Sequence, residues 1–162
     1  MKNIRLTKKI DYKQINSILD EAFGPGRLAK SVYRYREYRS LLDSFSYVYE
    51  VKKNILASIS YCEISLNYLH KGLLLGPLVV KPEYKGKGFG VSLVEYSINK
   101  IKNSKLYDFI ILIGELEYYQ RFEFKKVKHK VKFIGPVNPE KILILQLNKK
   151  IKISNDHIVH FS

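Results

Sequence analysis

The chain begins with a stripe of apolar residues at helical spacing. The stripe is formed by Ile15, Ile18, Leu19, Ala22 and Phe23. Asp11 and Gln14 precede it in the pattern of a capping box, and Gly24-Pro25 follows it as a stop signal. The sequence therefore predicts a helix over residues 11–23, and a second helix is predicted over residues 28–42.

Strand patterns occupy the next part of the chain. Residues 45–51 and 55–66 are rich in β-branched and aromatic side chains, and Lys52-Lys53-Asn54 between them predicts a hairpin turn. Residues 73–80 form a continuous apolar run. Such a run is typical of a central strand that is buried on both faces.

Helix and strand patterns alternate in the remainder. A helix of about three turns is marked by Val91, Val94, Ile98 and Ile101. A strand is predicted over residues 107–113, a short helical segment over 115–122, and further strands over 126–134 and 142–148. The order β-α-α-β-β-β-α-β-α-β-β predicts an α/β or α+β fold in which helices pack on a sheet.

Three glycines stand at alternate positions between the apolar run and the following helix. They are Gly86, Gly88 and Gly90. Glycine costs about 0.5–1 kcal/mol relative to alanine inside an element, so three of them suggest that bare backbone is needed. A loop before a helix N-terminus presents unpaired N–H groups and the positive end of the helix dipole, and Lys85 and Lys87 add positive charge. The loop predicts a phosphate site, with a tight turn that binds no ligand as the alternative. Its spacing matches neither a P-loop nor the dinucleotide fingerprint.

The formal net charge of the chain is +14. The basic residues gather in three clusters. These are Arg27, Lys30, Arg34, Arg36 and Arg39; then Lys85 and Lys87; then Lys125, Lys126, Lys128, Lys130 and Lys132. Such clusters attract nucleic acid, acidic proteins or a phosphorylated cofactor. A compositional bias that leaves the lysines merely solvated explains the charge equally well.

Composition excludes several classes of protein. With 46% hydrophobic residues, 162 residues suffice for one folded domain, and no linker divides them. No window resembles a signal peptide or a membrane span, so we expect a soluble protein of the cytoplasm. Cys62 alone forms neither a disulfide framework nor a zinc cluster, and the histidines, among them His157 and His160 near the end, lack metal spacing. We expect Cys62 to be a buried apolar residue, and we expect no metal.

The glycine loop resembles the signature of a known superfamily. The run "VVKPEYKGKGFG" is similar to the acetyl-coenzyme A signature of GNAT N-acyltransferases, V-x-P-x-x-(Q/R)-x-x-G-x-(G/A). Further blocks resemble a bacterial branch of small N-acetyltransferases, in the same order. They are "AFGPGRLAKSVYRYRE" at 22–37, "LLLGPLVV" at 73–80, "GELEYYQRFEF" at 114–124 and "GPVNPEKILILQL" at 135–147.

This resemblance spans most of the chain. It implies a GNAT fold, in which a mixed central sheet is splayed at the fourth strand and flanked by helices. The expected organisation is a single GNAT domain over residues 1–148 and a C-terminal tail over 149–162.

The resemblance also implies a cofactor site and a general acid. The segment of the fourth strand that meets the pantetheine arm, next to a strand bulge, corresponds to Leu78, Val79 and Val80. The pyrophosphate loop corresponds to Gly86, Lys87, Gly88, Phe89, Gly90 and Val91. The tyrosine that serves many members as general acid corresponds to Tyr119. Acetyl-coenzyme A is thus the expected co-substrate.

Two positions depart from the family pattern. Lys85 stands where the family usually has Gln or Arg, so a forked donor becomes a single ammonium. Glu123 replaces the usual glycine of R-F-G-F. If that position is left-handed, the glutamate costs roughly 1–2 kcal/mol.

The implied reaction is direct attack of a primary amine on the acetyl thioester, in a ternary complex. The acceptor is a small molecule, peptide or protein, and its character is acidic if the basic clusters contact it. Candidate bases are Glu63, Glu115 and Glu117, each of which has a solvated surface role as its alternative. Tyr118 is expected to pack in the core, because neighbouring helical residues point about 100° apart and only one tyrosine can face the thiol.

A second class of function fits the same sequence. The protein could be a degenerate GNAT-fold module that binds nucleic acid or an acidic protein through its basic surface. The intact glycines and Tyr119 favour the enzyme, whereas the charge favours the module only weakly. Nucleic acid and membranes are therefore not the expected partners.

Overall fold

The computed structural model describes residues 3–24, 26, 44–128, 131–133, 136–152 and 159–161. The helix predicted over residues 28–42 and the basic cluster over 27–39 lie outside these residues. The strands are β1 (Ile4–Leu6), β2 (Tyr47–Val51), β3 (Asn54–Leu66), β4 (His70–Val80), β5 (Phe109–Ile113), β6 (Lys125–Lys126), β7 (Ile142–Gln146) and β8 (Val159–Phe161). The α-helices are α1 (Tyr12–Phe23), α3 (Phe89–Ser104) and α4 (Leu116–Tyr119).

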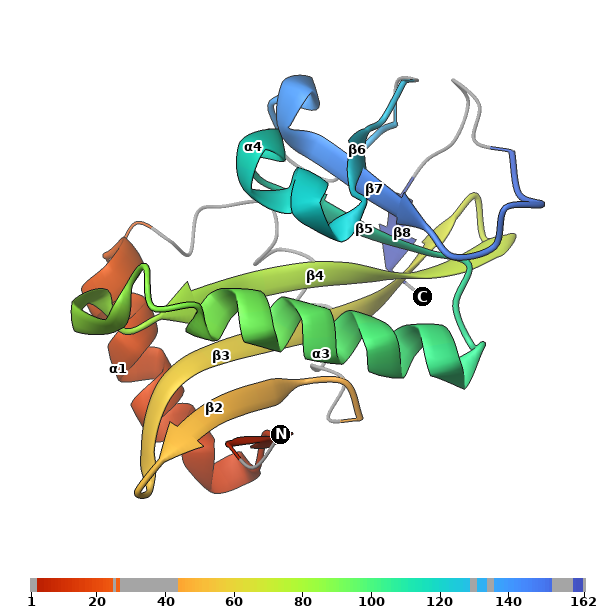
Figure 1. Cartoon of the computed structure of the whole chain (residues 1–162). Helices are drawn as coiled ribbons and strands as arrows, with labels where there is room; N and C mark the ends of the chain where they lie inside the picture. The colour runs from red at the N-terminus through yellow and green to blue at the C-terminus, as the bar shows by residue number, and fades with distance from the viewer. Residues whose placement is uncertain are drawn as a thin grey trace.

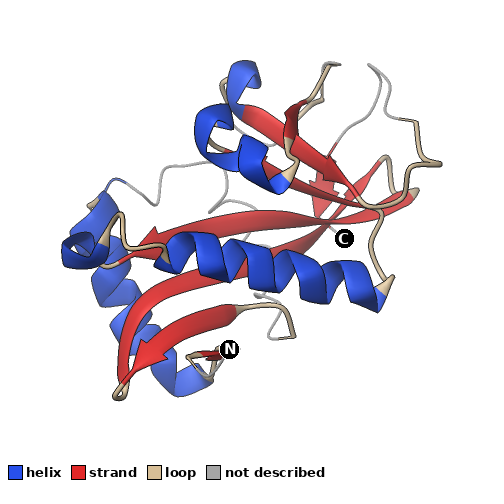
Figure 2. Cartoon of the chain, in the orientation of Figure 1, coloured by secondary structure: helices blue, strands red, loops and turns tan. Residues whose placement is uncertain are grey.

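The strands form one mixed sheet with helices on both faces. Its order is β1-β2-β3-β4-β5-β7-β6, and β8 pairs with β3 beyond the end of β2. Helix α3 lies across one face, where its apolar side packs on Ala57, Ile59 and Tyr61 of β3 (Figure 1). Helix α1 covers the other face beside β2 and β4 (Figure 2). The predicted combination of sheet and flanking helices is confirmed.

The predicted hairpin and first helix are present, but the predicted capping box is wrong. Lys52 and Lys53 adopt left-handed conformations that turn β2 into β3. The Asp11 carboxylate accepts from the Lys8 backbone N–H (2.6 Å) and pairs with the Arg5 guanidinium. Gln14 instead accepts from the Ile55 backbone N–H (3.1 Å) and so joins α1 to β3. A single 3-10 turn before α1 takes the place of the cap.

Of the strand predicted over residues 126–134, the described residues confirm only Lys126 and a single bridge at Lys132, and residues 129, 130 and 134 lie outside the described ranges. Lys125–Lys126 pair with β7, and the Val127 N–H donates to the Ile142 carbonyl (3.1 Å). The Lys132 backbone carbonyl accepts from the Val159 N–H of β8 (2.9 Å). The segment 149–162, expected to be a tail, supplies β8, which pairs with Ile64–Leu66 of β3. His160 on β8 stacks on Tyr68 at a centroid distance of 3.8 Å.

Strands β4 and β5 pair along only part of their length. Their parallel pairing runs from Gly72 opposite Phe109 to Leu74 opposite Ile111, and it stops there although both strands continue. On its other edge β4 stays paired with β3 through a bulge, because Gly76 and Pro77 together oppose Ser60. The sheet therefore opens into a V between residues 75–80 and 112–114.

The closed end of this V depends on a close approach at Gly72. A Cβ atom at position 72 would lie 2.3 Å from the Phe109 ring. We expect Gly72→Ala to lower the free energy of unfolding by about 1–3 kcal/mol, as overpacking does. Chemical denaturation of Gly72→Ala, Phe109→Leu and the double variant checks this. The double variant should lose less unfolding free energy than the two single variants lose in sum, because the smaller leucine side chain at position 109 leaves room for the alanine. Losses that simply add would contradict the contact.

Candidate active site

The glycine loop connects β4 to α3 through one 3-10 turn (Pro82–Tyr84). Gly86 has φ = +78° and Gly88, the residue before α3, has φ = +85°. These left-handed conformations favour glycine. A Cβ added to either residue would meet no atom within 4 Å, so both glycines border open space.

Backbone N–H groups at the start of α3 are available to a ligand. The first intrahelical bond runs from the Ser92 N–H to the Gly88 carbonyl (2.9 Å). The amides of Phe89, Gly90 and Val91 precede it and have no acceptor one turn back in the helix. They form the positive end of a helix of sixteen residues, which favours an anion.

A cavity of about 500 Å³ lies against this loop. All of the residues predicted to bind the cofactor line it except Lys87, whose ammonium instead lies 4.8 Å from the centre of the Tyr84 ring. The cavity is also lined by Ala22, Phe23, Tyr84, Tyr118 and Arg121, none of which the sequence had assigned to the cofactor. None of the described residues that line it is acidic. The shape and charge of this space fit a phosphate-bearing group.

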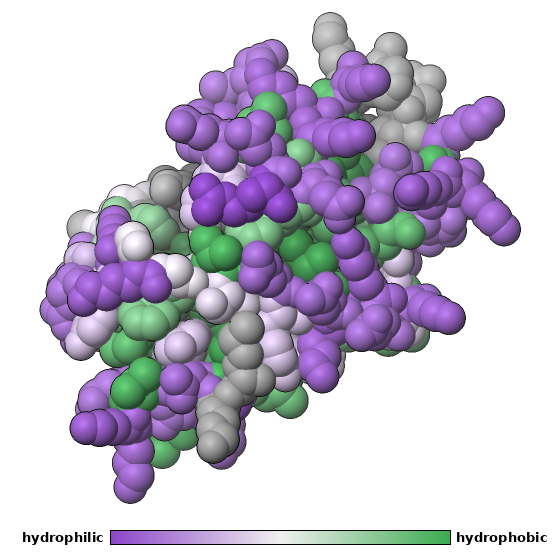
Figure 3. All heavy atoms as spheres, viewed as in Figure 1, coloured by the Kyte–Doolittle hydropathy of each residue, from purple (hydrophilic) through white to green (hydrophobic). Residues whose placement is uncertain are grey.

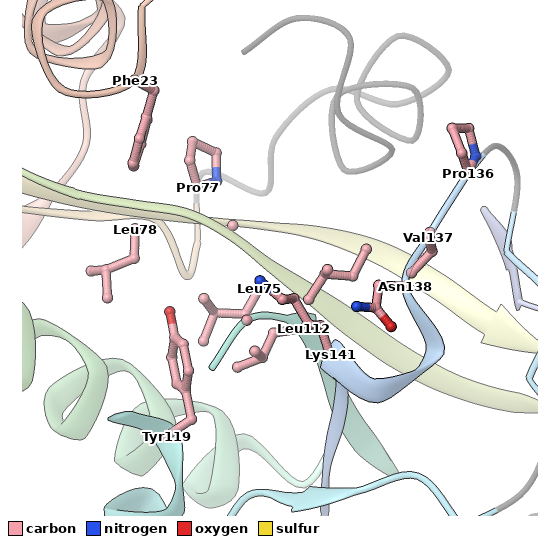
Figure 4. A pocket seen from close by; sticks show the side chains of 13 residues that line it. Phe23, Leu75, Pro77, Leu78, Leu112, Tyr119, Pro136, Val137, Asn138 and Lys141 are labelled. Carbon is pink, nitrogen blue, oxygen red and sulfur yellow. The ribbon is translucent and has the colours of Figure 1, made fainter. Parts of the chain in front are cut away.

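A second cavity, of about 410 Å³, fills the opening of the V. One wall is the end of β4, at Leu75, Gly76, Pro77 and Leu78. The other wall is residues 112–114, with Tyr119 and residues 136–138 beside it (Figure 4). Leu78 and Phe23 line both cavities, so the two cavities are neighbours near the end of β4.

Tyr119 lies at the edge of the V and its hydroxyl points toward β4 near Leu78 (Figure 4). Its ring is held by Phe124 at a centroid distance of 5.8 Å and by Tyr118 at 4.8 Å. A Cβ at Gly114 would come within 2.8 Å of this ring, so the glycine makes room for it. Burial raises the pKa of Tyr119, and the phenol therefore carries its proton at neutral pH.

Tyr118 does not simply pack in the core as expected. It lines the cavity at the glycine loop, where its hydroxyl lies 3.0 Å from the position a Gly90 Cβ would take. Burial raises the pKa of Tyr118, an effect that the nearby Arg121 guanidinium opposes. The two tyrosines thus diverge, Tyr119 toward the V and Tyr118 toward the start of α3.

Glu123 adopts a left-handed conformation, which is the condition under which a strain cost was expected at this position. Its φ is +70°, and its carboxylate lies 3.1 Å from the Lys102 ammonium of α3. The expected cost of roughly 1–2 kcal/mol therefore applies to Glu123. The turn keeps its form, since Phe122 and Phe124 on either side are both buried.

The candidate bases lie apart from the cavities. Glu63 accepts from the Tyr107 hydroxyl (2.6 Å) and pairs with Lys71, at the closed end of the V. Glu115 pairs with Lys141, which lines the V. Glu117 is exposed on α4. Within the described ranges, no group of three or more His, Cys, Asp or Glu side chains could hold a metal, and Cys62 is fully buried in an apolar cluster.

The sequence pattern of the Acetyltransferase (GNAT) family matches residues 12–124. This chain belongs to that family. The enzyme's glycine loop and the two strand ends that form the V lie within the matched residues, whereas residues 136–138 and Lys141 of the cavity lie beyond them. No helix in the described part of the GNAT chain is long and apolar enough to cross a membrane.

Solved structures of other GNAT proteins share the fold. A GNAT family N-acetyltransferase of Escherichia coli, in complex with coenzyme A, aligns with a TM-score of 0.78 at 20% identity, over 97% of this chain and 88% of the other. An acetyltransferase of Brucella melitensis in complex with acetyl-coenzyme A has a TM-score of 0.65 at 24% identity, over 88% and 94%. The ribosomal-protein-S18-alanine N-acetyltransferase of Escherichia coli has a TM-score of 0.64 at 14% identity, over 93% and 98%. None of the curated protein sequences compared with the chain matches it.

Proposed function

We propose that this protein transfers an acetyl group from acetyl-coenzyme A to a primary amine by direct attack in a ternary complex. One observation carries the proposal: Leu78 lines both the cavity at the glycine loop and the cavity in the V, and Tyr119 lines the latter. A ligand with a phosphate at one end and a reactive group at the other fits this arrangement. The complexes of the Escherichia coli and Brucella melitensis proteins with coenzyme A and acetyl-coenzyme A support the same ligand here.

Different residues bind different parts of acetyl-coenzyme A. Gly86, Gly88 and the first amides of α3 hold the pyrophosphate, and Lys85 adds a positive charge. The backbone of residues 78–80 meets the pantetheine arm. Because β5 has left β4 by this point, N–H and C=O groups on that edge of β4 are open to an extended ligand. The bound thioester supplies the activated acetyl group.

The Tyr119 phenol assists the departure of the coenzyme A sulfur. The acceptor nitrogen forms the new N–C bond, the C–S bond breaks, and the electron pair stays on sulfur. Even an unperturbed phenol, with a pKa near 10, is a weaker acid than a thiol near 8.5, and burial weakens Tyr119 further. The phenol therefore donates a hydrogen bond to the sulfur while charge develops there, and its proton passes late.

The acceptor must lose a proton before it attacks. Keeping a lysine amine neutral at pH 7 costs about 4.6 kcal/mol, whereas an α-amine near pKa 8 costs about 1.4 kcal/mol. No acidic residue of the described ranges lines the V. The site therefore favours an amine of low pKa, such as the α-amine of a peptide.

Two assays of the purified protein test the proposal. Acetyl-coenzyme A should raise the melting temperature, and α-amine peptides should release free thiol from it faster than lysine side chains of matched peptides. A protein that is stabilised by an RNA oligomer and not by acetyl-coenzyme A would be a binding module. Stabilisation by acetyl-coenzyme A with no thiol release from any amine would mean that catalysis is lost.

Substitution at Gly88 tests the phosphate cradle. Acetyl-coenzyme A at about 100 times its dissociation constant should stabilise the wild-type fold by roughly 2.7 kcal/mol. Gly88→Val should abolish this shift, because a branched side chain fills the open space in front of the amides. The melting temperature of Gly88→Val without ligand separately reports the loss of stability from a valine in a left-handed conformation. A folded variant that keeps the full shift would place the phosphate elsewhere.

Substitution at Lys85 tests the kind of contact it makes. Its side chain is exposed, so its ammonium should act mainly through charge that salt screens. Lys85→Gln should weaken coenzyme A binding modestly at low salt and hardly at all near molar salt. Calorimetric titration at both salt concentrations measures this. A loss that ignores salt would reveal a buried, directional contact.

Substitution of the two tyrosines tests the general acid. Tyr119→Phe should lower kcat roughly 10²-fold, the low end for general acid catalysis, because a thiolate leaves tolerably well unaided. Acetyl-coenzyme A affinity should barely move, since the ring packing survives. Tyr118→Phe, the matched control, should keep a kcat near that of wild type. If Tyr118→Phe proves the more damaging change, the assignment of Tyr119 is wrong.

A further inference from the structure

The cavity at the glycine loop is lined by a second cation besides Lys85, which is Arg121. It follows α4 in a 3-10 turn (Gln120–Phe122), three residues after Tyr118. Residues at this spacing lie on the same side of a helical segment. Arg121 and Tyr118 both line the same cavity as Lys85, Gly86 and Gly88.

A tyrosine ring holds the Arg121 guanidinium in place. The guanidinium carbon lies 5.2 Å from the centre of the Tyr118 ring, within the range of a cation–π contact. The Tyr118 ring is itself packed against Phe122, at a centroid distance of 5.8 Å, and its hydroxyl reaches Gly90 of α3. Stacking of this kind positions the planar group and leaves its N–H donors free for a ligand.

Charges around Arg121 also point to an anion. In the described part of the chain no acidic residue pairs with Arg121. The acidic residues near Arg121 in the sequence have other partners, because Glu123 pairs with Lys102 and Glu115 pairs with Lys141. Lys85 and Arg121 are thus the charged residues of a cavity that has no described acidic lining.

The loop itself lacks a forked donor. Lys85 offers one ammonium where the family pattern has Gln or Arg, and an ammonium binds phosphate as a point charge. We propose that Arg121, held on the Tyr118 ring, binds the pyrophosphate of coenzyme A with its forked N–H groups and so replaces the missing donor at position 85. The pyrophosphate is assigned because Gly86 and Gly88, which are proposed to hold that group, line the same cavity as Arg121. This inference rests on the proposed function.

Titration of Arg121 variants with two ligands tests the inference. Arg121→Gln keeps the stem and removes the charge, and Arg121→Lys keeps the charge and removes the fork. Lys100→Gln is the matched control, because the Lys100 ammonium also lies over a tyrosine ring (5.4 Å from the centre of Tyr96) but does not line the cavity. Calorimetry gives the Kd of each variant for coenzyme A and for 3′-dephospho-coenzyme A, which retains the pyrophosphate.

We expect Arg121→Gln to raise the Kd for both ligands by the same factor, about tenfold or more, as the loss of a charged hydrogen bond does. Arg121→Lys should remain several-fold weaker than wild type, and Lys100→Gln should match wild type. Three results would overturn the inference: an unchanged Kd in Arg121→Gln, a loss confined to coenzyme A, which would assign Arg121 to the 3′-phosphate, or full recovery in Arg121→Lys. If folded wild-type protein binds neither ligand, the proposed function itself fails.

Discussion

Beyond Leu74 and Ile111 the neighbouring strands β4 and β5 no longer pair, and the site is arranged around that loss. Buried backbone N–H and C=O groups need partners, so a strand that gives up one neighbour must find a substitute. Strand β4 keeps β3 on one side through the bulge at Gly76 and Pro77. Its other edge faces the cavity, where an extended ligand with amide groups, such as the proposed pantetheine arm, supplies what β5 does not.

The separation of β5 from β4 also determines where α4 lies. The chain leaves β5 at Gly114, and the bare backbone there admits the Tyr119 ring. Gly90, in the first turn of α3, likewise leaves room for the Tyr118 hydroxyl. Two close approaches at glycine, one in β5's exit and one in the first turn of α3, therefore bring α4 against both ends of the site.

Sequence patterns were sufficient where an element carries its own periodicity. The long strands, α1, α3 and the glycine loop were predictable for that reason. Strand β8 spans three residues, too few for a period, and it forms because β3 offers an open edge beyond the end of β2. Gln14 bonds Ile55 rather than its own helix, and Arg121 stacks on Tyr118 beside a distant loop. Both contacts depend on tertiary placement, which spacing alone does not contain.

Total charge is a weaker guide to function than the position of each charge. The α3 face is largely covered by hydrophilic residues, with hydrophobic residues reaching the surface near its centre (Figure 3). Charges on such a surface attract any polyanion and are screened over about 8 Å at physiological salt. The cavity beside the glycine loop is different, since it combines helix amides, bare backbone and two cations with no described acid. We propose that this combination selects a small phosphate-bearing ligand over an extended polymer, in keeping with the acetyltransferase family to which the chain belongs.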